Sequence, residues 1–224
     1  MQLRSILLTI TLFIFTSAGA VSAFSNDLGV VERWLQTNAE TQSLKVDFVQ
    51  SRSLKALKNP LVQPGTLWLD YATNQFRWQL GDPAKTIVVS QGEKIAVMRT
   101  PLKRIEYRDP DESSGSSSGF SSLTKGFPKT LPEFQKRYRI LDIATKGNSF
   151  EIVTQPLGPE SEGVHRFGFV IDQQRFLLKG LVIELVDGSN ITTTFQRVDR
   201  NAKIEPAVFH PDTSGYRETK FKAG

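Results

Sequence analysis

Few residues of this sequence have the type and spacing that catalysis requires. Gly115-Ser116-Ser117-Ser118-Gly119 matches the Gly-x-Ser-x-Gly pattern that carries the nucleophile of many hydrolases. That pattern works only between a strand and a tightly packed helix, whereas here it lies in polar, low-complexity sequence. We therefore expect no enzyme, and an ester hydrolase acting through Ser117 is the most distant of the functions considered.

Imidazole and carboxylate groups give no better case for a reactive site. The sequence has only two histidines, His165 and His210, which are too few and too isolated for a histidine-based metal site. Alternation along the strand puts His165 on the inward face with Phe167, which predicts a core histidine. The acidic residues between positions 109 and 112 lack the remaining oxygen ligands of a calcium site. We expect neither a metal nor a cofactor.

Apolar side chains at every second position give the stronger chemical signal. One face of the predicted sheet is aromatic and aliphatic, and such a face must be buried against something. The sequence supplies little helix to cover it, so the face either forms a packed β core or lines a cavity for hydrocarbon. The candidate cavity residues are Phe48, Leu67, Leu69, Tyr71, Phe76, Trp78, Phe167, Phe169, Ile183 and Phe195.

These side chains belong to a mainly β chain of roughly eleven strands. Short turns such as Gly81-Asp82-Pro83 separate the alternating segments, and this spacing is typical of an antiparallel meander. We expect an unclosed antiparallel β barrel, although a fully closed barrel fits the pattern as well. The predicted strands span 46–50, 67–71, 76–80, 86–90, 94–98, 104–108, 138–143, 149–154, 165–172, 177–187 and 191–198.

Two segments have helical spacing and are available to cover the sheet. The first, 27–43, carries Leu28, Val31 and Leu35 on one face with Trp34 beside them. The second follows the Ser/Gly-rich stretch 113–119, which we expect to be a mobile loop. It is predicted to form one or two short helices, broken near Pro128 and Pro132, that act as a lid. The predicted lid residues are Phe120, Leu123, Phe127, Leu131 and Phe134.

The N-terminus has the features of a cleaved secretory signal peptide over residues 1–23. Arg4 precedes an apolar run from Ile6 to Phe15, and Val21-Ser22-Ala23 supplies small residues for cleavage. An uncleaved membrane anchor is the alternative. The chain has no cysteine, which excludes a disulfide framework and a cysteine-linked lipid anchor. We therefore expect a free periplasmic protein.

The exported part, 24–224, has the length of one all-β domain, and we expect a monomer. The formal net charge of the whole chain is +5, with the basic residues scattered along the sequence. No nucleic-acid-binding motif is present, so no nucleic acid partner is expected. The charge is compatible with attraction to anionic lipid or to an acidic partner.

Several short motifs in order resemble the LolA family of outer-membrane lipoprotein carriers. The motifs follow the first predicted helix at about the spacing seen in that family, and they cover most of the exported chain. They are Val46-Asp47-Phe48-Val49-Gln50, Pro64-Gly65-Thr66-Leu67-Trp68-Leu69, Phe76-Arg77-Trp78, Ile87-Val88-Val89-Ser90-Gln91-Gly92 and Phe209-His210-Pro211 with Gly215. The resemblance implies an unclosed β barrel with a helical lid over an apolar interior. It also implies acyl-chain cargo, an inner-membrane ABC transporter as donor and an outer-membrane acceptor.

One departure from the family concerns the lid. Family members commonly carry a basic residue followed by proline after the Leu-Trp strand, and that arginine latches the lid by bonding to helix carbonyls. Here the matching stretch reads Leu69-Asp70-Tyr71-Ala72-Thr73, where Tyr71 is a weaker donor. Phe76 falls on a family position at the pocket mouth, with Trp78 next to it on the inward face. A carrier of acylated cargo and a sensor of lipidated or misfolded envelope proteins therefore both remain open.

Overall fold

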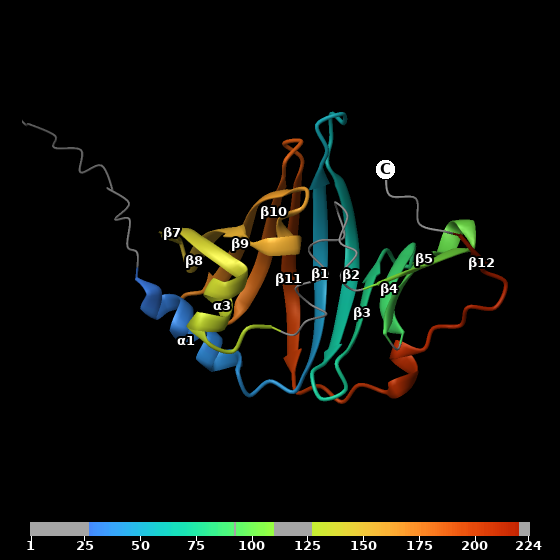
Figure 1. Cartoon of the computed structure of the whole chain (residues 1–224), viewed down its shortest axis with the longest axis horizontal. Helices are drawn as coiled ribbons and strands as arrows, with labels where there is room; N and C mark the ends of the chain where they lie inside the picture. The colour runs from blue at the N-terminus through green and yellow to red at the C-terminus, as the bar shows by residue number, and fades with distance from the viewer. Residues whose placement is uncertain (1–26, 92, 110–126, 220–224) are drawn as a thin grey trace, which may run out of the picture.

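The protein is built around one twelve-stranded sheet that does not close on itself (Figure 1). The computed structural model describes residues 27–91, 93–109 and 127–219. The strand order is β12-β6-β5-β4-β3-β2-β1-β11-β10-β9-β8-β7. The strands are β1 (Ser43–Ser53), β2 (Leu61–Asp70), β3 (Gln75–Leu80), β4 (Thr86–Gln91), β5 (Lys94–Arg99), β6 (Arg104–Arg108), β7 (Tyr138–Lys146), β8 (Ser149–Pro156), β9 (Val164–Asp172), β10 (Leu178–Leu185), β11 (Asn190–Arg200) and β12 (Arg217–Glu218).

The sheet consists of two antiparallel meanders, β1 to β6 and β7 to β11, that are joined by the antiparallel pair β1–β11. Each of the eleven predicted strands is present, and the mainly β, unclosed architecture is confirmed. The twelfth strand, β12, was missed. It has only two residues and pairs in parallel with β6, so no alternation marks it in the sequence.

Two α-helices occur in the described part of the chain. Helix α1 (Leu28–Asn38) begins after Asp27, whose carboxylate accepts a hydrogen bond from the backbone N–H of Gly29 at 3.0 Å. The predicted end of this helix is wrong, because Ser43 already pairs with Asp70 as the first residue of β1. Leu28, predicted on the apolar face, is instead 38% exposed.

Helix α3 (Leu131–Arg137) is short and has a well-defined start. The Thr130 hydroxyl accepts from the backbone N–H of Glu133 at 3.4 Å, and the Glu133 carboxylate accepts from the backbone N–H of Lys129 at 2.9 Å. Pro132 lies in the first turn, where its missing N–H costs nothing. The predicted helix boundary near Pro132 is present, with residues 127–130 outside a helix and Pro132 in the first turn of α3.

Some sequence predictions lie outside the described residues. They are the signal peptide 1–23, the 113–119 loop with its Gly-x-Ser-x-Gly pattern, the lid residues Phe120 and Leu123, and Asp111 and Glu112 of the acidic stretch.

The inner face of the sheet carries two apolar clusters. The helix-covered cluster joins α1 and α3 to β7–β10. Its buried members are Val30, Val31, Trp34, Leu35, Phe134, Tyr138, Ile143, Ile152, Phe167, Phe169, Ile171 and Leu181. The strand cluster contains Val46, Phe48, Leu67, Leu69, Phe76, Trp78, Val88, Ile95 and Val97, and no residue of α1 or α3 belongs to it. Phe195 of β11 packs against both clusters, at the seam between the two meanders.

The outer face of β4–β6 is covered by the C-terminal segment, which includes the short helix η4 (Pro206–Phe209). Two further short helices, η1 (Thr100–Leu102) and η3 (Gly158–Ser161), lie in connections. Phe209 is 1% exposed within this outer cluster. Arg77 of β3 donates a hydrogen bond to the Val208 carbonyl oxygen at 3.0 Å, and its guanidinium carbon lies 5.5 Å from the Trp68 ring centroid. These contacts attach the segment to the sheet.

The predicted inward position of His165 is wrong. A register irregularity near the start of β9 makes Val164 pair with Leu185 and Arg166 pair with Glu184. Val164 is consequently buried, whereas His165 and His210 are both exposed. Simple alternation fails at such an irregularity because the extra residue reverses the facing of its neighbours.

Candidate functional site

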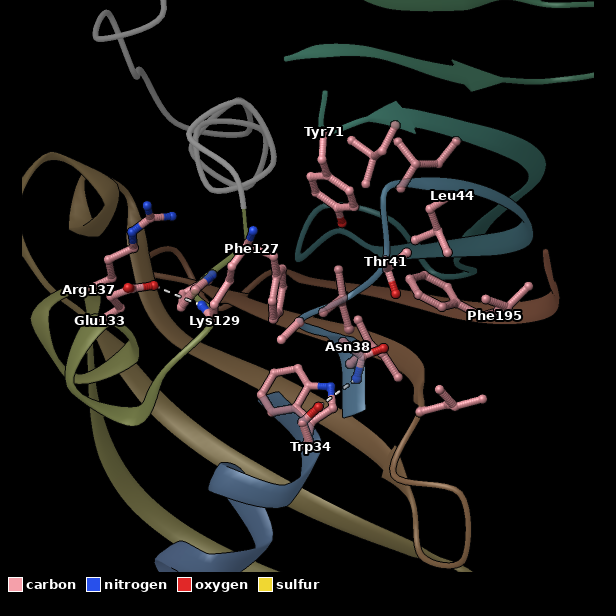
Figure 2. Close-up of a pocket in the computed structure, with 18 of the residues that line it drawn as sticks. Trp34, Asn38, Thr41, Leu44, Tyr71, Phe127, Lys129, Glu133, Arg137 and Phe195 are labelled. Carbon is pink, nitrogen blue, oxygen red and sulfur yellow. Dashed lines mark hydrogen bonds between the residues drawn. The ribbon is translucent and has the colours of Figure 1, made fainter. Parts of the chain in front are cut away.

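An apolar pocket lies at the seam between the two meanders, where β1 begins and β11 ends. Its volume is about 430 Å³, within the range of ligand-binding pockets. Figure 2 shows its walls, which come from α1, the α1–β1 connection, the start of β1, β2, α3 and the segment before it, β10 and β11. The lining residues are Trp34, Asn38, Ala39, Thr41, Leu44, Leu67, Leu69, Tyr71, Asn74, Phe127, Pro128, Lys129, Glu133, Arg137, Leu177, Leu178, Leu181, Phe195 and Val198.

The structure brings together some of the predicted cavity and lid residues and separates others. Leu67, Leu69, Tyr71 and Phe195 line this pocket, together with Phe127 of the predicted lid. The others pack elsewhere on the inner face: Phe48, Phe76 and Trp78 in the strand cluster, and Phe167, Phe169, Ile183, Leu131 and Phe134 in or against the helix-covered cluster.

Aromatic rings form the α-helical wall of the pocket. Trp34 of α1 meets Phe127 edge-on, with ring centroids 5.2 Å apart. Behind it lie Phe134 and Phe169, at 5.8 and 5.1 Å. Such edge-to-face and tilted contacts hold each ring in one orientation. The Trp34 ring is therefore a fixed surface, against which Phe127 closes the pocket from the side of α3.

Aliphatic side chains of β1 and β2 form the opposite wall, next to a close contact between Gly65 and Phe48. Gly65 pairs with Phe48, whose ring lies over the glycine, and a Cβ at position 65 would collide with that ring. The Phe48 ring in turn packs against Trp78 at 4.3 Å. The Gly-x-Leu-Trp motif can be explained by the structure. Gly65 leaves room for the Phe48 ring, and Leu67 faces inward and lines the pocket.

Polar side chains between α1 and β1 already have partners. The Asn38 amide donates to the carbonyl oxygens of Trp34 and Phe176, at 2.7 and 3.2 Å. The Thr41 hydroxyl accepts from the Arg200 guanidinium at 3.1 Å. These bonds tie the end of α1 to the β9–β10 connection and the α1–β1 connection to β11, and they leave the interior of the pocket largely apolar.

Tyr71 differs from Asn38 and Thr41 in this respect. Figure 2 shows its side chain among the pocket residues, and its hydroxyl makes no hydrogen bond within the described part of the chain. Burial raises the pKa of Tyr71 to about 12, so the phenol is neutral and able to donate at physiological pH. Among the described residues, Tyr71 therefore makes no latch to α3 of the kind that an arginine provides in the family.

Charged groups gather where α3 borders the pocket. Lys129, Glu133 and Arg137 all line this side, and the Glu133 carboxylate accepts the Lys129 N–H. The pocket is thus apolar inside and charged along one border. That distribution suits an amphipathic ligand with a hydrocarbon tail and a polar head.

Sequence reasoning missed several lining residues. Asn38, Ala39 and Thr41 lie in or beside the α1–β1 connection, where no periodic signal exists. Leu44 was within reach of the pattern, because the alternation of Val46 and Phe48 extends back to it. Val198 was obscured by the register shift between β1 and β11.

An open, curved sheet with helices over part of its inner face and an apolar pocket at its seam defines a class of hydrophobic-ligand-binding proteins. The model of the family described as "outer membrane lipoprotein carrier protein LolA" matches residues 39–212. The chain belongs to this LolA family. The family description is one of binding and transport.

Individual relatives are distant in sequence. An outer-membrane lipoprotein carrier protein of Dechloromonas aromatica is 26% identical over 184 residues, which are 81% of this chain and 82% of the relative. One of Nitrosospira multiformis is 25% identical over 201 residues, 88% of this chain and 89% of the relative. The crystal structure of an uncharacterized conserved protein from Thermus thermophilus has a TM-score of 0.53 at 7% identity, covering 88% of this chain and all of that one. The last similarity supports the fold alone.

Within the described ranges, no helix is long and apolar enough to cross a membrane.

Proposed function

We propose that this protein is a periplasmic carrier that holds acyl chains of lipoproteins, or of other lipids, in the apolar pocket at the seam. The observation that carries the proposal is the pocket itself, which is lined by apolar side chains in a chain of the LolA family. The named relatives are lipoprotein carriers, which supports the same cargo here. The proposal assigns a binding and transport role and no catalytic one.

The energetics suit reversible transport. Burial of one methylene contributes about 0.8 kcal/mol, so a chain of roughly fifteen carbons supplies on the order of ten kcal/mol before the costs of ordering. Release then requires an element that opens easily. Helix α3 has only seven residues, too few for a helix that is stable by itself.

We assign the lid to the segment from Phe120 to Phe134, of which the structure describes residues 127–134. Phe127 contacts Trp34 on one side and lines the pocket on the other, so its movement would open the pocket. The remaining parts of the proposal follow the family. Residues 1–23 are a cleaved signal peptide, 24–224 form one monomeric domain, and cargo passes from an inner-membrane ABC transporter to an outer-membrane acceptor.

A sensor role is the alternative, because the stretch 69–73 that matches the family's latch has neither arginine nor proline. Tyr71 of this stretch makes no hydrogen bond to α3 among the described residues. Native mass spectrometry of protein purified from its host separates the two roles. Co-purified lipid or lipoprotein supports the carrier. A stable protein partner with an empty pocket supports the sensor.

Acyl binding is tested with a fluorescent fatty acid and residues 24–224. Val198→Asp places a carboxylate in the pocket wall, and we expect binding at least tenfold weaker because burial of an unpaired charge is costly. Phe127→Ala should weaken binding less, because it removes one side of the enclosure. The control is Leu102→Asp, since Leu102 is 58% exposed and lies outside the pocket.

Thermal unfolding establishes that each variant is folded. Unchanged affinity in a folded Val198→Asp variant would contradict the assignment of the pocket.

A further inference from the structure

Exposed apolar side chains concentrate at two hairpin tips, far from the pocket. Of the seven large hydrophobic residues that are exposed in the described part of the chain, four lie there. Leu57, Leu61 and Val62 belong to the β1–β2 hairpin and are 46%, 45% and 59% exposed. Val186 belongs to the β10–β11 hairpin and is 72% exposed. Single exposed apolar residues are ordinary, but a group on projecting loops indicates a contact surface.

The two tips form one surface because their strands are paired. β1 lies beside β11, with Ser53 opposite Asn190, and the backbone N–H of Lys55 donates to the Ser189 hydroxyl at 3.4 Å. Figure 1 shows both hairpins projecting beyond the sheet at the top of the view. Ser189 is 2% exposed beneath the tips, so this end of the seam is itself packed.

The surface is also basic. Arg52, Lys55 and Lys58 lie on the first hairpin, which has no acidic residue between Asp47 and Asp70. Asp187 is the carboxylate within 186–189, where it accepts hydrogen bonds from the backbone N–H and hydroxyl of Ser189. Glu184 precedes it on β10, and the exposed Glu162 is next to Gly163, whose carbonyl oxygen accepts from the Val186 N–H. The cationic side chains are therefore concentrated on the first hairpin, where Lys55 and Lys58 are exposed beside Leu57, Leu61 and Val62.

We propose that the tip surface, formed by residues 52–62 and 186–189, docks on a bilayer that contains anionic lipid. The lysines contact lipid phosphates while Leu57, Val62 and Val186 enter the boundary between head groups and acyl chains. An apolar group bordered by cations matches that boundary, where burial and charge attraction act together. A protein partner would have to combine an acidic surface with an apolar slot for two separate loops.

Docking by the tips has a geometric consequence for the pocket. The pocket residues Leu44 and Tyr71 lie at the opposite ends of β1 and β2 from the tips. An eleven-residue strand spans about 35 Å. Docking therefore leaves the pocket facing away from the bilayer, and membrane binding is independent of acyl binding.

The test is co-sedimentation of residues 24–224 with vesicles. Vesicles of phosphatidylethanolamine and phosphatidylglycerol should bind the protein, and binding should weaken with salt. Vesicles of phosphatidylcholine alone should bind it at least tenfold less. Leu57→Trp should show blue-shifted fluorescence on the anionic vesicles compared with the same variant in buffer. A Leu57→Trp spectrum that does not move would contradict insertion.

Tip variants and matched controls locate the binding. Leu57→Ser with Val62→Ser should reduce vesicle binding roughly tenfold. Lys55→Glu with Lys58→Glu should reduce it by about twenty-five-fold or more. The matched controls, Leu102→Ser and Lys203→Glu, alter side chains of similar or greater exposure away from the tips and should bind normally.

Affinity for the fluorescent fatty acid should be unchanged in all these variants. Equal losses in tip and control variants would overturn the proposal, and so would binding that requires an acidic protein instead of anionic lipid. Loss of fatty-acid binding in Val198→Asp with normal vesicle binding would show that the two sites are separate.

Discussion

The helix-covered cluster and the strand cluster share the inner face of one sheet but are packed by different means. In the first, Trp34, Phe134, Tyr138, Phe167 and Phe169 form a continuous set of ring contacts beneath two helices. In the second, Phe48 and Trp78 make the one ring contact among the described members. The pocket lies where the two meet, and takes Trp34 and Leu181 from one side and Leu67 and Leu69 from the other. The pocket thus has one wall held by aromatic ring contacts and one formed by aliphatic side chains.

The largest expected effect tests that difference directly. Phe169→Ala should lower the free energy of unfolding by about 3–5 kcal/mol, because Phe169 is 1% exposed and contacts rings of Trp34, Phe134 and Tyr138. Phe76→Ala should cost less by about 1 kcal/mol, because Phe76 is as buried but has no ring contact with a described aromatic residue. Urea unfolding measures both, and equal costs would erase the distinction between the clusters.

A smaller effect is expected from Gly65→Ala, which crowds the strand cluster. The new methyl group would meet the Phe48 ring and lie 2.5 Å from the Gln79 carbonyl oxygen. Overpacking of this kind costs about 1–3 kcal/mol. The comparison variant is Gly168→Ala, whose nearest neighbour, the Val182 Cβ, is 3.3 Å away. Unfolding in urea should rank Gly65→Ala as the more damaging change, and the opposite order would exclude tight packing of Phe48 on Gly65.

Arg77→Leu should lower the free energy of unfolding by about 1–2 kcal/mol, because Arg77 attaches the C-terminal segment to the outer face of the sheet. The variant removes the hydrogen bond to the Val208 carbonyl oxygen and the contact with the Trp68 ring. Burial lowers the pKa of Arg77, but a guanidinium stays protonated at neutral pH. Amide hydrogen exchange should accelerate in residues 203–216 and remain unchanged in α1. Arg197→Leu, an exposed arginine on β11, is the control.

The smallest effect at neutral pH concerns Tyr71. Because burial raises its folded-state pKa from 10.0 to about 12, the unfolded chain loses this proton first as the pH rises. Stability contributed by the neutral phenol is therefore present below pH 10 and declines between about pH 10 and 12. Tyr71→Phe should unfold like the wild type at pH 7 and lose less stability than the wild type over that alkaline interval. If the free energy of unfolding of the wild type and of Tyr71→Phe changed with pH in the same way, Tyr71 would not be buried at the pocket.

Most of the fold was predictable, because the alternation of side chains along a strand is local in sequence and is kept when strands pair. The prediction failed where the strand pairing is irregular or the strand is too short to show alternation. The irregularity beside Val164 turned His165 outward, and β12 is too short to carry a pattern. The C-terminal cover of the outer face could not be inferred either, since the contact of Arg77 with Val208 depends on chain segments far apart in sequence.

The candidate site was predictable only in part, for a similar reason. Alternation identifies which residues face inward but does not say which of them are in contact with another layer. Phe167 and Phe169 therefore looked equivalent to Leu67 and Leu69, although the helices cover the first pair. Lining residues from connections, such as Asn38 and Thr41, have no periodic signature.

The joining of the two meanders by β1 and β11 also bears on how the protein reaches its native state. Partners such as Val46 and Val198 come from nearly opposite ends of the described chain, and contacts between such distant segments form slowly. Each meander consists of neighbouring hairpins that can assemble early, whereas the seam must wait for both. We expect the pocket to be the last feature to appear during folding, so that a newly made chain would acquire the proposed capacity for hydrocarbon only when folding is complete.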